Sequence, residues 1–340
     1  MMREFINKIQ QKINLSQEEI ESVMQEIMSG QAKNQDIADF LMALREKGPT
    51  IDEITGAARI MRRFVVPVTT KHQRIIDTCG TGGDKMNTFN ISTISAFVVA
   101  GAGGIVAKHG NRSVSSNCGS ACVLEKCGVN LNVEEKHLSA CLDQVGIAFL
   151  FAQRLHPAMK NVAPVRKELG VETIFNVLGP LTNPASATHQ VMGVYHRDFV
   201  EPMARVLKNL GLQRALVVHG SDGLDEITST GSTFMCEYNG EDIQSYEFNP
   251  EELGVSLARG SDLIGGNVGE NVRIFKKILS GAQGPKRDIV VLNAAFALYV
   301  GEIVPNIQAG FDAAKKSIDS GMAQKKLDDL IELTHSPVLD

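Results

Sequence analysis

The sequence predicts an α/β protein, in which a small all-helical domain (residues 1–70) precedes a larger domain (71–340) with a mostly parallel central sheet covered by helices. Residues 1–70 carry helix signals and hardly any strand signals. From residue 74 onward, short apolar runs alternate with helical stretches, and this order implies parallel strands joined by crossovers. A length of 340 residues fits one large domain with a small companion, because single cores stop growing in this size range.

The helices of the first domain are bounded by capping signals. Ser16 with Glu19, and Thr50 with Glu53, have the spacing of capping boxes, in which each side chain satisfies an unpaired amide at a helix start. Gly30 and the glycine at 48 stand where helices are expected to end. The apolar residues between these marks recur at helical spacing, so each helix has one face to bury.

The strands of the second domain are expected in the runs "RIIDTC", "GGIVAKHG", "VGIAFLFA", "HQVMGVYH" and "RALVVHG". Asn239-Gly240 lies between two alternating runs and predicts a hairpin turn. After Glu251 the pattern returns to helices, including "ENVRIFKKILSG" and "DIVVLNAAFALYVG".

Composition excludes some classes of partner. The net charge of −5 gives no global attraction to nucleic acid or to an anionic membrane, and a chain with no Trp has few residues for stacking bases. No run has the length or apolarity of a signal peptide or membrane span. The six cysteines show no disulfide framework spacing, so we expect a reducing cytoplasm.

A glycine-rich stretch, "DTCGTGGDKMNTFNIST" at residues 77–93, joins a strand-like run to a helix-like run. Gly80, Gly82 and Gly83 lack side chains, so their amides can point together at an anion, just before a helix that supplies a positive dipole end. The spacing matches neither a Walker loop nor a nicotinamide fingerprint. Phosphate is the ligand that this stretch favours, and a tight turn without a ligand is the alternative.

A second polar cluster, "AKHGNRSVSSNCGSA" at residues 107–121, is expected to form a loop after the next strand. Lys108 and Arg112 combine two cations with Asn111 and several serines as short hydrogen-bond donors. We expect a second anion-binding loop here, and a solvated surface loop is the alternative.

Two further stretches carry charged candidates. In "VVHGSDGLDEIT", Asp225 and Glu226 stand near Asp222 at a strand end, and such a pair suits Mg²⁺, which binds through one or two carboxylates while phosphates fill further positions. A turn with solvated acids is the alternative. Arg166 lies one step off the apolar stripe of a helix expected after Pro157, where it could hold a carboxylate by two parallel bonds. Composition alone favours an ordinary surface arginine.

Taken in order, "GTGGD", "TFNIST", "KHGNR", "HPAMK", "FNVLGPLTNP" and "HGSDGLDE" resemble the anthranilate phosphoribosyltransferase family, within the nucleoside phosphorylase-like class of phosphoribosyltransferases. The resemblance runs over nearly the whole chain. It implies a reaction of tryptophan biosynthesis, in which 5-phosphoribosyl 1-pyrophosphate (PRPP) and anthranilate give N-(5-phosphoribosyl)anthranilate and pyrophosphate. It also implies two Mg²⁺ ions bound with PRPP. Homodimers are implied to form through the helical domain, which a helical insertion near residues 156–185 joins in space.

The same resemblance implies the site residues. PRPP is implied to contact Gly80, Gly83, Asp84, Thr88, Asn90, Ile91, Ser92, Thr93, Lys108, His109, Gly110, Asn111, Arg112, Ser113, Val114, Ser115, Ser116 and Ser120. Anthranilate is implied to contact Gly80, Asn111 and Arg166, and Mg²⁺ to be carried by Ser92, Asp225 and Glu226. The chain departs from the family pattern at Cys118, where a serine is usual, and at Cys122, where an aspartate is usual.

We expect catalysis by positioning and charge stabilisation, with no residue acting as a strong general base, because an aryl amine is already neutral at pH 7. His109 is the one candidate base, and a structural role in shaping the pocket fits it better. Two alternatives remain. A pyrimidine nucleoside phosphorylase would use free phosphate without an acidic pair for Mg²⁺, and a relative that binds nucleic acid would need a basic face.

Overall fold

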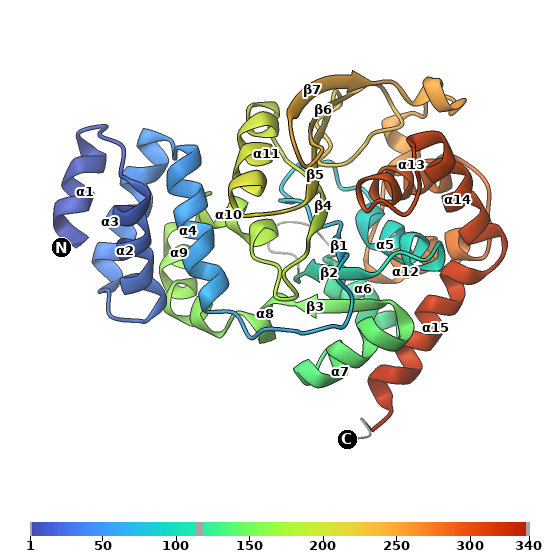
Figure 1. Cartoon of the computed structure of the whole chain (residues 1–340), viewed down its shortest axis with the longest axis horizontal. Helices are drawn as coiled ribbons and strands as arrows, with labels where there is room; N and C mark the ends of the chain where they lie inside the picture. The colour runs from blue at the N-terminus through green and yellow to red at the C-terminus, as the bar shows by residue number, and fades with distance from the viewer. Residues whose placement is uncertain (1, 113–117, 338–340) are drawn as a thin grey trace.

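The computed structural model describes residues 2–112 and 118–337. Figure 1 shows a group of amino-terminal helices beside a larger body in which helices surround a sheet. The predicted fold class is therefore confirmed: a small helical region precedes an α/β region with a mostly parallel sheet. None of the helices within the described ranges is long and apolar enough to cross a membrane.

The amino-terminal bundle comprises α1 (Met2–Gln10), α2 (Gln17–Met28), α3 (Asn34–Lys47) and α4 (Ile51–Arg63). Both predicted capping boxes are confirmed, at the start of α2 and at the start of α4. Gly30 follows the end of α2 with a φ of +78°, and the glycine that ends α3 has a φ of +83°, so both helices end in backbone that glycine favours.

A later segment packs against this bundle. It contains α8 (Ala152–Leu155), a 3₁₀ turn (Pro157–Asn161), α9 (Ala163–Leu169), α10 (Phe175–Leu178) and a second 3₁₀ turn (Gly179–Leu181). Val162, Val165 and Phe175 share one apolar core with the buried side chains of α2 and α3. The amide of Asn161 also donates to the carbonyl of Met28, at 2.9 Å.

The sheet has seven strands in the order β3-β2-β1-β4-β5-β6-β7. Its parallel strands are β1 (Ile76–Asp77), β2 (Val106–Gly110), β3 (Ile147–Phe151), β4 (His189–Gly193) and β5 (Arg214–Gly220). The antiparallel hairpin of β6 (Thr233–Tyr238) and β7 (Ile243–Phe248) extends one edge, and its turn contains the predicted Asn239-Gly240 pair.

Helices cover both faces of the sheet (Figure 1). One face packs against α11 (Val200–Asn209), which also contacts α4, so that the core of the bundle continues onto this face through Met192 and Val217. The other face, with Val191 and Leu216, belongs to a second core. The helices of this second core and their short neighbours are α5 (Ile91–Gly101), α6 (Ser120–Cys127), α7 (Glu135–Ala140) with a π turn (Cys141–Val145), α12 (Val268–Leu279), α13 (Pro285–Val300), α14 (Ile307–Asp319) and α15 (Met322–His335).

The strand order places a crevice at the centre of the sheet. From β1 the chain proceeds to β2 on one side, and β4 later pairs on the other side of β1. In an open parallel sheet, this reversal of strand order leaves a ligand crevice outside the carboxyl ends of the strands. The segments that follow β1, β2, β4 and β5 are therefore the ones that position a site.

Candidate active site

The glycine-rich turn (residues 79–84) follows β1 and binds to the ends of two neighbouring segments. The amide of Thr81 donates to the carbonyl of Gly193 at 2.9 Å, and the amide of Gly82 donates to Oδ2 of Asp225 at 2.7 Å. The turn therefore already holds one anionic group on a backbone amide. This contact brings together two stretches that the sequence separates by 143 residues.

Two different constraints require glycine in this turn. A Cβ on Gly80 would lie 2.9 Å from the carbonyl oxygen of Gly193, so the close approach of β4 excludes a side chain there. Gly82 and Gly83 have φ values of +64° and +88°, which side chains rarely adopt. No described atom beyond its chain neighbours lies within 4 Å of the Cβ position on Gly82, so a side chain there would meet open space, and only the backbone conformation favours glycine.

The acidic loop (residues 221–228) follows β5 and carries two crowded carboxylates. Oε1 of Glu226 accepts a hydrogen bond from the amide of Ser92 at 3.2 Å. Burial raises the pKa of Glu226 to about 7. Burial also raises the pKa of Asp225 well above its usual value, and repulsion from Glu226 and from the carboxylate of Asp84 adds to this shift. The loop therefore gathers more negative charge than its surroundings neutralise.

Lys108 and His109 belong to β2 and are buried, so the prediction that they lie in a loop after the strand was wrong. Nζ of Lys108 donates to the carbonyl of Thr78 at 2.9 Å, and the amide of His109 donates to Oδ1 of Asp77 at 3.2 Å. The side chain of Lys108 is tolerated in a buried strand because the carbonyl of Thr78, directly after β1, accepts from it, whereas Asp77 binds only the backbone of His109. The charge of Lys108 opposes the burial that raises the pKa of Asp77 to about 6.

His109 and His156 form a buried pair. Their Nε2 atoms are 3.0 Å apart, so one ring donates a hydrogen bond to the other. Burial, with the positive charges of His156 and Lys108 as further causes, lowers the pKa of His109 to about 3. Burial lowers the pKa of His156 to about 4. Both rings are therefore neutral at pH 7.

The residues after β2 form a smaller cluster. The carbonyl of Asn111 accepts from Oγ of Ser120 at 3.3 Å, and Ser120 lies at the start of α6. Arg112 forms an ion pair with Glu125 at 3.0 Å and donates to Sγ of Cys122 at 3.9 Å. Cys122 thus contacts the arginine from the position where the family pattern has an aspartate. A Cβ on Gly110 would meet Oγ of Ser120 at 2.5 Å, so β2 and α6 touch there. The predicted residues Ser113, Val114, Ser115 and Ser116 lie outside the described residues.

The start of α5 lies between the glycine-rich turn and the acidic loop. Asn90 occupies its N-cap position, and its side-chain amide donates to the carbonyl of Cys118 at 3.2 Å. Ile91 and Thr93 are each 1% exposed, so both residues pack inside the protein, whereas Ser92 between them is only partly buried. Thr88 precedes the helix and forms an isolated bridge with Ile264.

Arg166 lies on α9, next to the amino-terminal bundle. Its guanidinium is centred 5.5 Å from the ring of Phe175, and it donates to the side-chain oxygen of Asn176 at 3.4 Å. Burial lowers its pKa. Among the described residues, no carboxylate forms an ion pair with it, so the guanidinium keeps its bidentate donor edge for another anion.

Sequence reasoning missed three residues that build the site. A Cβ on Gly193 would lie 1.6 Å from the carbonyl oxygen of Asp225, so only glycine lets the acidic loop pass the end of β4. Asp77 accepts from the side chain of Asn183 at 2.7 Å, and Asn183 also donates to the carbonyl of Ala107 at 2.8 Å. The signal for Gly193 was present, because a glycine inside a strand marks a close backbone approach.

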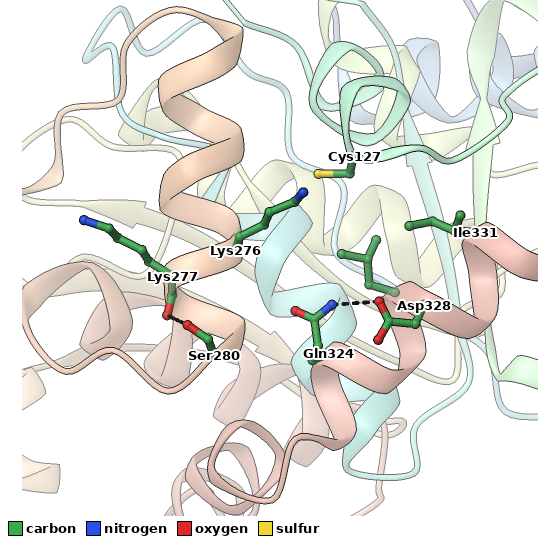
Figure 2. Close-up of a pocket in the computed structure, with 8 residues that line it drawn as sticks. Cys127, Lys276, Lys277, Ser280, Gln324, Asp328 and Ile331 are labelled. Carbon is green, nitrogen blue, oxygen red and sulfur yellow. Dashed lines mark hydrogen bonds between the residues drawn. The ribbon is translucent and has the colours of Figure 1, made fainter.

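A separate cavity lies away from these strand ends. Figure 2 shows it between α6, α12 and α15, with Lys276 and Asp328 on opposite walls. Its volume is about 490 Å³, and it is open to solvent. One lining residue, Cys127, ends the helix α6 that follows β2, and the others belong to α12, its end and α15, so the cavity shares no residue with the site described above.

Comparison with known proteins identifies the family. Residues 72–324 match the model of the α/β domain of a glycosyl transferase family, and residues 3–65 match the model of the helical bundle domain of a glycosyl transferase family. The anthranilate phosphoribosyltransferase of Acetivibrio thermocellus is 51% identical over 99% of this chain and 97% of its own length. The chain belongs to the anthranilate phosphoribosyltransferase family.

Other members of the family support this assignment. The anthranilate phosphoribosyltransferase of Clostridium kluyveri is 50% identical over 97% of this chain and 99% of its own length. A crystal structure from Thermus thermophilus superposes with a TM-score of 0.93 at 38% identity, covering 97% of this chain and 99% of that one. The family member from Saccharomyces cerevisiae, in complex with PRPP and Mg, has a TM-score of 0.91 at 28% identity and covers 99% and 98%.

Proposed function

We propose that this chain transfers the phosphoribosyl group of PRPP to the amine of anthranilate, giving N-(5-phosphoribosyl)anthranilate and pyrophosphate in tryptophan biosynthesis. One observation carries the proposal: the glycine-rich turn and the acidic loop meet through the bond from Gly82 to Asp225. A glycine-rich turn therefore stands beside two carboxyl groups whose pKa values stay raised, although the charge of Lys108 opposes the shift of Glu226. This combination suits a substrate that brings phosphates together with a divalent cation.

PRPP is proposed to lie at this crevice. The residues proposed to contact PRPP are those implied by the family pattern. They are Gly80, Gly83, Asp84, Thr88, the first turn of α5, the segment 108–116 and Ser120. Within this set, Lys108 contributes a buried positive charge: it is 4% exposed, and one of its three N–H groups donates to the carbonyl of Thr78. Its contribution is electrostatic, and a charge held in a site of low dielectric acts strongly on nearby phosphates.

Mg²⁺ is proposed to be held by Asp225, Glu226 and Ser92. The side chains fit such an ion, because two crowded carboxylates with raised pKa values lie beside a helix start and lack a full countercharge. No group of three His, Cys, Asp or Glu side chains in the described part of the chain forms a complete metal site. This too fits Mg²⁺, which binds through one or two carboxylates and takes phosphate oxygens and water as its other ligands. Two ions are proposed, as in the sequence-based expectation.

When bound, Mg²⁺ supplies positive charge that offsets the charge developing on the departing pyrophosphate. The chain itself contributes position and fixed dipoles: the amides of the glycine-rich turn, the start of α5 and the charge of Lys108. No residue is proposed to act as a strong general base. His109 has a pKa of about 3, far from the neutral range in which a general base works best, so a role in shaping the pocket fits it.

Anthranilate is proposed to lie between Arg166, Asn111 and Gly80. Arg166 is partly buried and has a free bidentate edge, which matches the carboxylate of anthranilate. Because Arg166 stands on α9 beside the bundle and the phosphate-binding segments stand on the sheet, the two substrates would enter from different sides of the crevice.

The domain division at residue 70 and the homodimer formed through the helical domain are also proposals. The contacts of α9 and α10 with the bundle support joining the segment 156–185 to the helical domain. Location in the cytoplasm is proposed from the six free cysteines, none of which is paired in the structure of the described residues.

The decisive experiment follows the fluorescence of anthranilate. We expect the signal to fall when the purified chain, PRPP and Mg²⁺ are all present, and to persist when any one of them is omitted. Phosphorolysis of thymidine or uridine without a metal requirement would instead favour a nucleoside phosphorylase. No loss of fluorescence with the complete mixture would contradict the proposed function.

A further inference from the structure

A buried amide on α13 clamps the backbone next to the acidic pair. Asn293 is 4% exposed, and its Oδ1 accepts from the amide of Ile227 at 3.0 Å. Its Nδ2 donates to the carbonyl of the same residue at 2.8 Å, and also to the carbonyl of Ile289 at 2.9 Å. Ile227 directly follows Glu226, so this pair of bonds fixes the backbone at the point where the carboxylates are carried.

The orientation of this amide is fully determined. Both hydrogens of the NH₂ group are used, and the carbonyl oxygen accepts the only nearby amide. Rotating the amide by half a turn would set NH₂ against an N–H and oxygen against two carbonyls, so the observed arrangement is the only satisfied one. The side-chain amide of Asn293 thus bonds both backbone groups of Ile227, as the backbone of a neighbouring β-strand would.

The same helix also fixes the other side of the site. Oγ of Ser95 on α5 donates to the carbonyl of Val290 on α13 at 3.2 Å. The first turn of α5 carries Ser92, whose amide binds Glu226. Helix α13 therefore holds both partners of that bond, Glu226 through Asn293 and Ser92 through the body of α5.

The amino-terminal half of the acidic loop has its own brace. Oδ1 of Asp222 accepts from the amide of Leu224 at 3.1 Å, and Oδ2 accepts from Oγ1 of Thr228 at 2.7 Å. This brace is internal to the loop, so it sets the loop's shape. Among the described contacts, the hydrogen bonds of Asn293 attach the backbone of Ile227, the residue after Glu226, to helix α13.

We infer that Asn293 is a positioning residue that holds Asp225 and Glu226 where they can share a divalent cation with PRPP. Two adjacent carboxylates repel each other, and a loop without the clamp can relieve that repulsion by moving apart. The cation would then find its ligands at the wrong separation. This inference rests on the proposed function, and it adds a residue that the family motifs in the sequence did not single out.

The test measures binding of Mn²⁺, as a probe for Mg²⁺, by electron paramagnetic resonance with PRPP present and anthranilate absent. Asn293→Leu removes all three hydrogen bonds at similar volume, and Asn293→Asp keeps the acceptor for the amide of Ile227 but loses the donors. We expect both variants to bind Mn²⁺ about 10-fold to 100-fold more weakly, as is typical when a residue that orients metal ligands is removed. The KM for anthranilate should stay close to that of the wild type.

Asn130→Leu is the matched control. Asn130 also bonds backbone groups with both ends of its amide, to the carbonyl of Thr334 at 3.2 Å and from the amide of Asn132 at 3.0 Å, far from the acidic loop. It should lose stability and keep the Mn²⁺ affinity of the wild type.

The outcomes separate the two proposals. A wild type that binds Mn²⁺ with PRPP but transfers nothing to anthranilate overturns the proposed function and leaves the role of Asn293 to be decided by the variants. Unchanged Mn²⁺ affinity in a folded variant overturns the role of Asn293. The same conclusion follows if neither variant folds, since Asn293 would then serve the fold. A wild type that binds no Mn²⁺ overturns both.

Discussion

Glu53 in the amino-terminal bundle is buried, the Asp225–Glu226 pair at the carboxyl ends of the strands is partly buried, and the partners of these carboxylates differ. Glu53 is fully buried and is neutralised within the bundle: it accepts from Nζ of Lys47 at 2.8 Å and from the amides of Thr50 and Leu15 at 2.7 and 2.9 Å. The two carboxyl groups of the acidic pair have raised pKa values and accept hydrogen bonds from the backbone amides of Gly82 and Ser92.

This difference distinguishes a structural charge from a functional one. A buried carboxylate with its own cation and amides completes the fold, and nothing further is needed. A pair that keeps surplus charge is less stable without a cation, and the raised pKa values of both groups express that cost. Such a site gains stability when a cation from outside the chain binds, which is the behaviour of a ligand site.

The largest effect is expected from removing the surplus charge. The double variant Asp225→Asn, Glu226→Gln should lose at least about 100-fold in turnover, because the charge stabilisation that depends on the metal is worth several kcal/mol. Without Mg²⁺ the same variant should melt no lower than the wild type, since mutual repulsion is gone. The assay follows anthranilate fluorescence against Mg²⁺ concentration, with thermal melting in parallel. An unchanged Mg²⁺ titration would make the acidic pair structural.

Removal of Glu53 from the bundle is expected to lower stability and to leave the Mg²⁺ dependence of activity unchanged. Glu53→Ala leaves Lys47 with no countercharge in a buried place and should lower the free energy of unfolding by about 3 to 5 kcal/mol. Because Glu53 contacts no segment of the site, the Mg²⁺ concentration for half-maximal activity should not change. Urea unfolding and a metal titration measure the two quantities. A stability loss that is absent, or a shifted Mg²⁺ requirement, would break the distinction drawn here.

Arg166 is the cationic counterpart of the acidic pair, being partly buried without an anionic partner among the described residues. Arg166→Ala should raise the KM for anthranilate by about 10-fold to 100-fold, because it removes the free energy of one hydrogen-bonded contact to a charged group. The KM for PRPP should change much less. Lys167→Ala, an exposed cation on the same helix, is the control and should change neither constant. Equal increases in both constants for Arg166→Ala would defeat its assignment to anthranilate.

The smallest expected effect is the pH dependence of stability that comes from two buried neutral histidines, His109 and His156. The pKa values of His109 and His156 lie below the unfolded value of 6.5, so the unfolded chain binds more protons than the native one as pH falls below 6.5. Stability is therefore full above pH 6.5 and is lost as pH falls toward about 4. Each histidine should cost about 1 kcal/mol between pH 7 and pH 5.5. Urea unfolding at both pH values should show a smaller loss in His156→Leu, and an equal loss would contradict neutral burial.

Sequence could predict features whose partners are close along the chain. The two capping boxes depend on residues three apart, the Asn239-Gly240 hairpin depends on a turn of four residues (239–242), and all are confirmed. The alternation of strands and helices likewise predicted the parallel sheet. The family motifs predicted the candidate site residues, and the roles of these residues stay predictions.

Features whose partners are distant along the chain could not be read in this way. The cluster that contains Lys108 was predicted to form a loop after the strand, but Lys108 lies in β2, and its partner, the carbonyl of Thr78, directly follows β1. The clamp by Asn293 joins positions separated by 66 residues, and Asn293 stands in the mostly apolar part of α13 that follows Asp288. Only the packing of α13 against the sheet domain brings them together.

The continuity of one apolar core from α2 through α11 to the inner side of β4 and β5 has a practical consequence for engineering. Trimming the first four helices would leave Met192, Val217 and the apolar side of α11 open to water. The truncated remainder would then aggregate rather than survive as an independent catalytic fragment, although separate family models describe the two parts. The amino-terminal helices therefore share one hydrophobic core with α11, β4 and β5, and the strands that carry the site pack against that core.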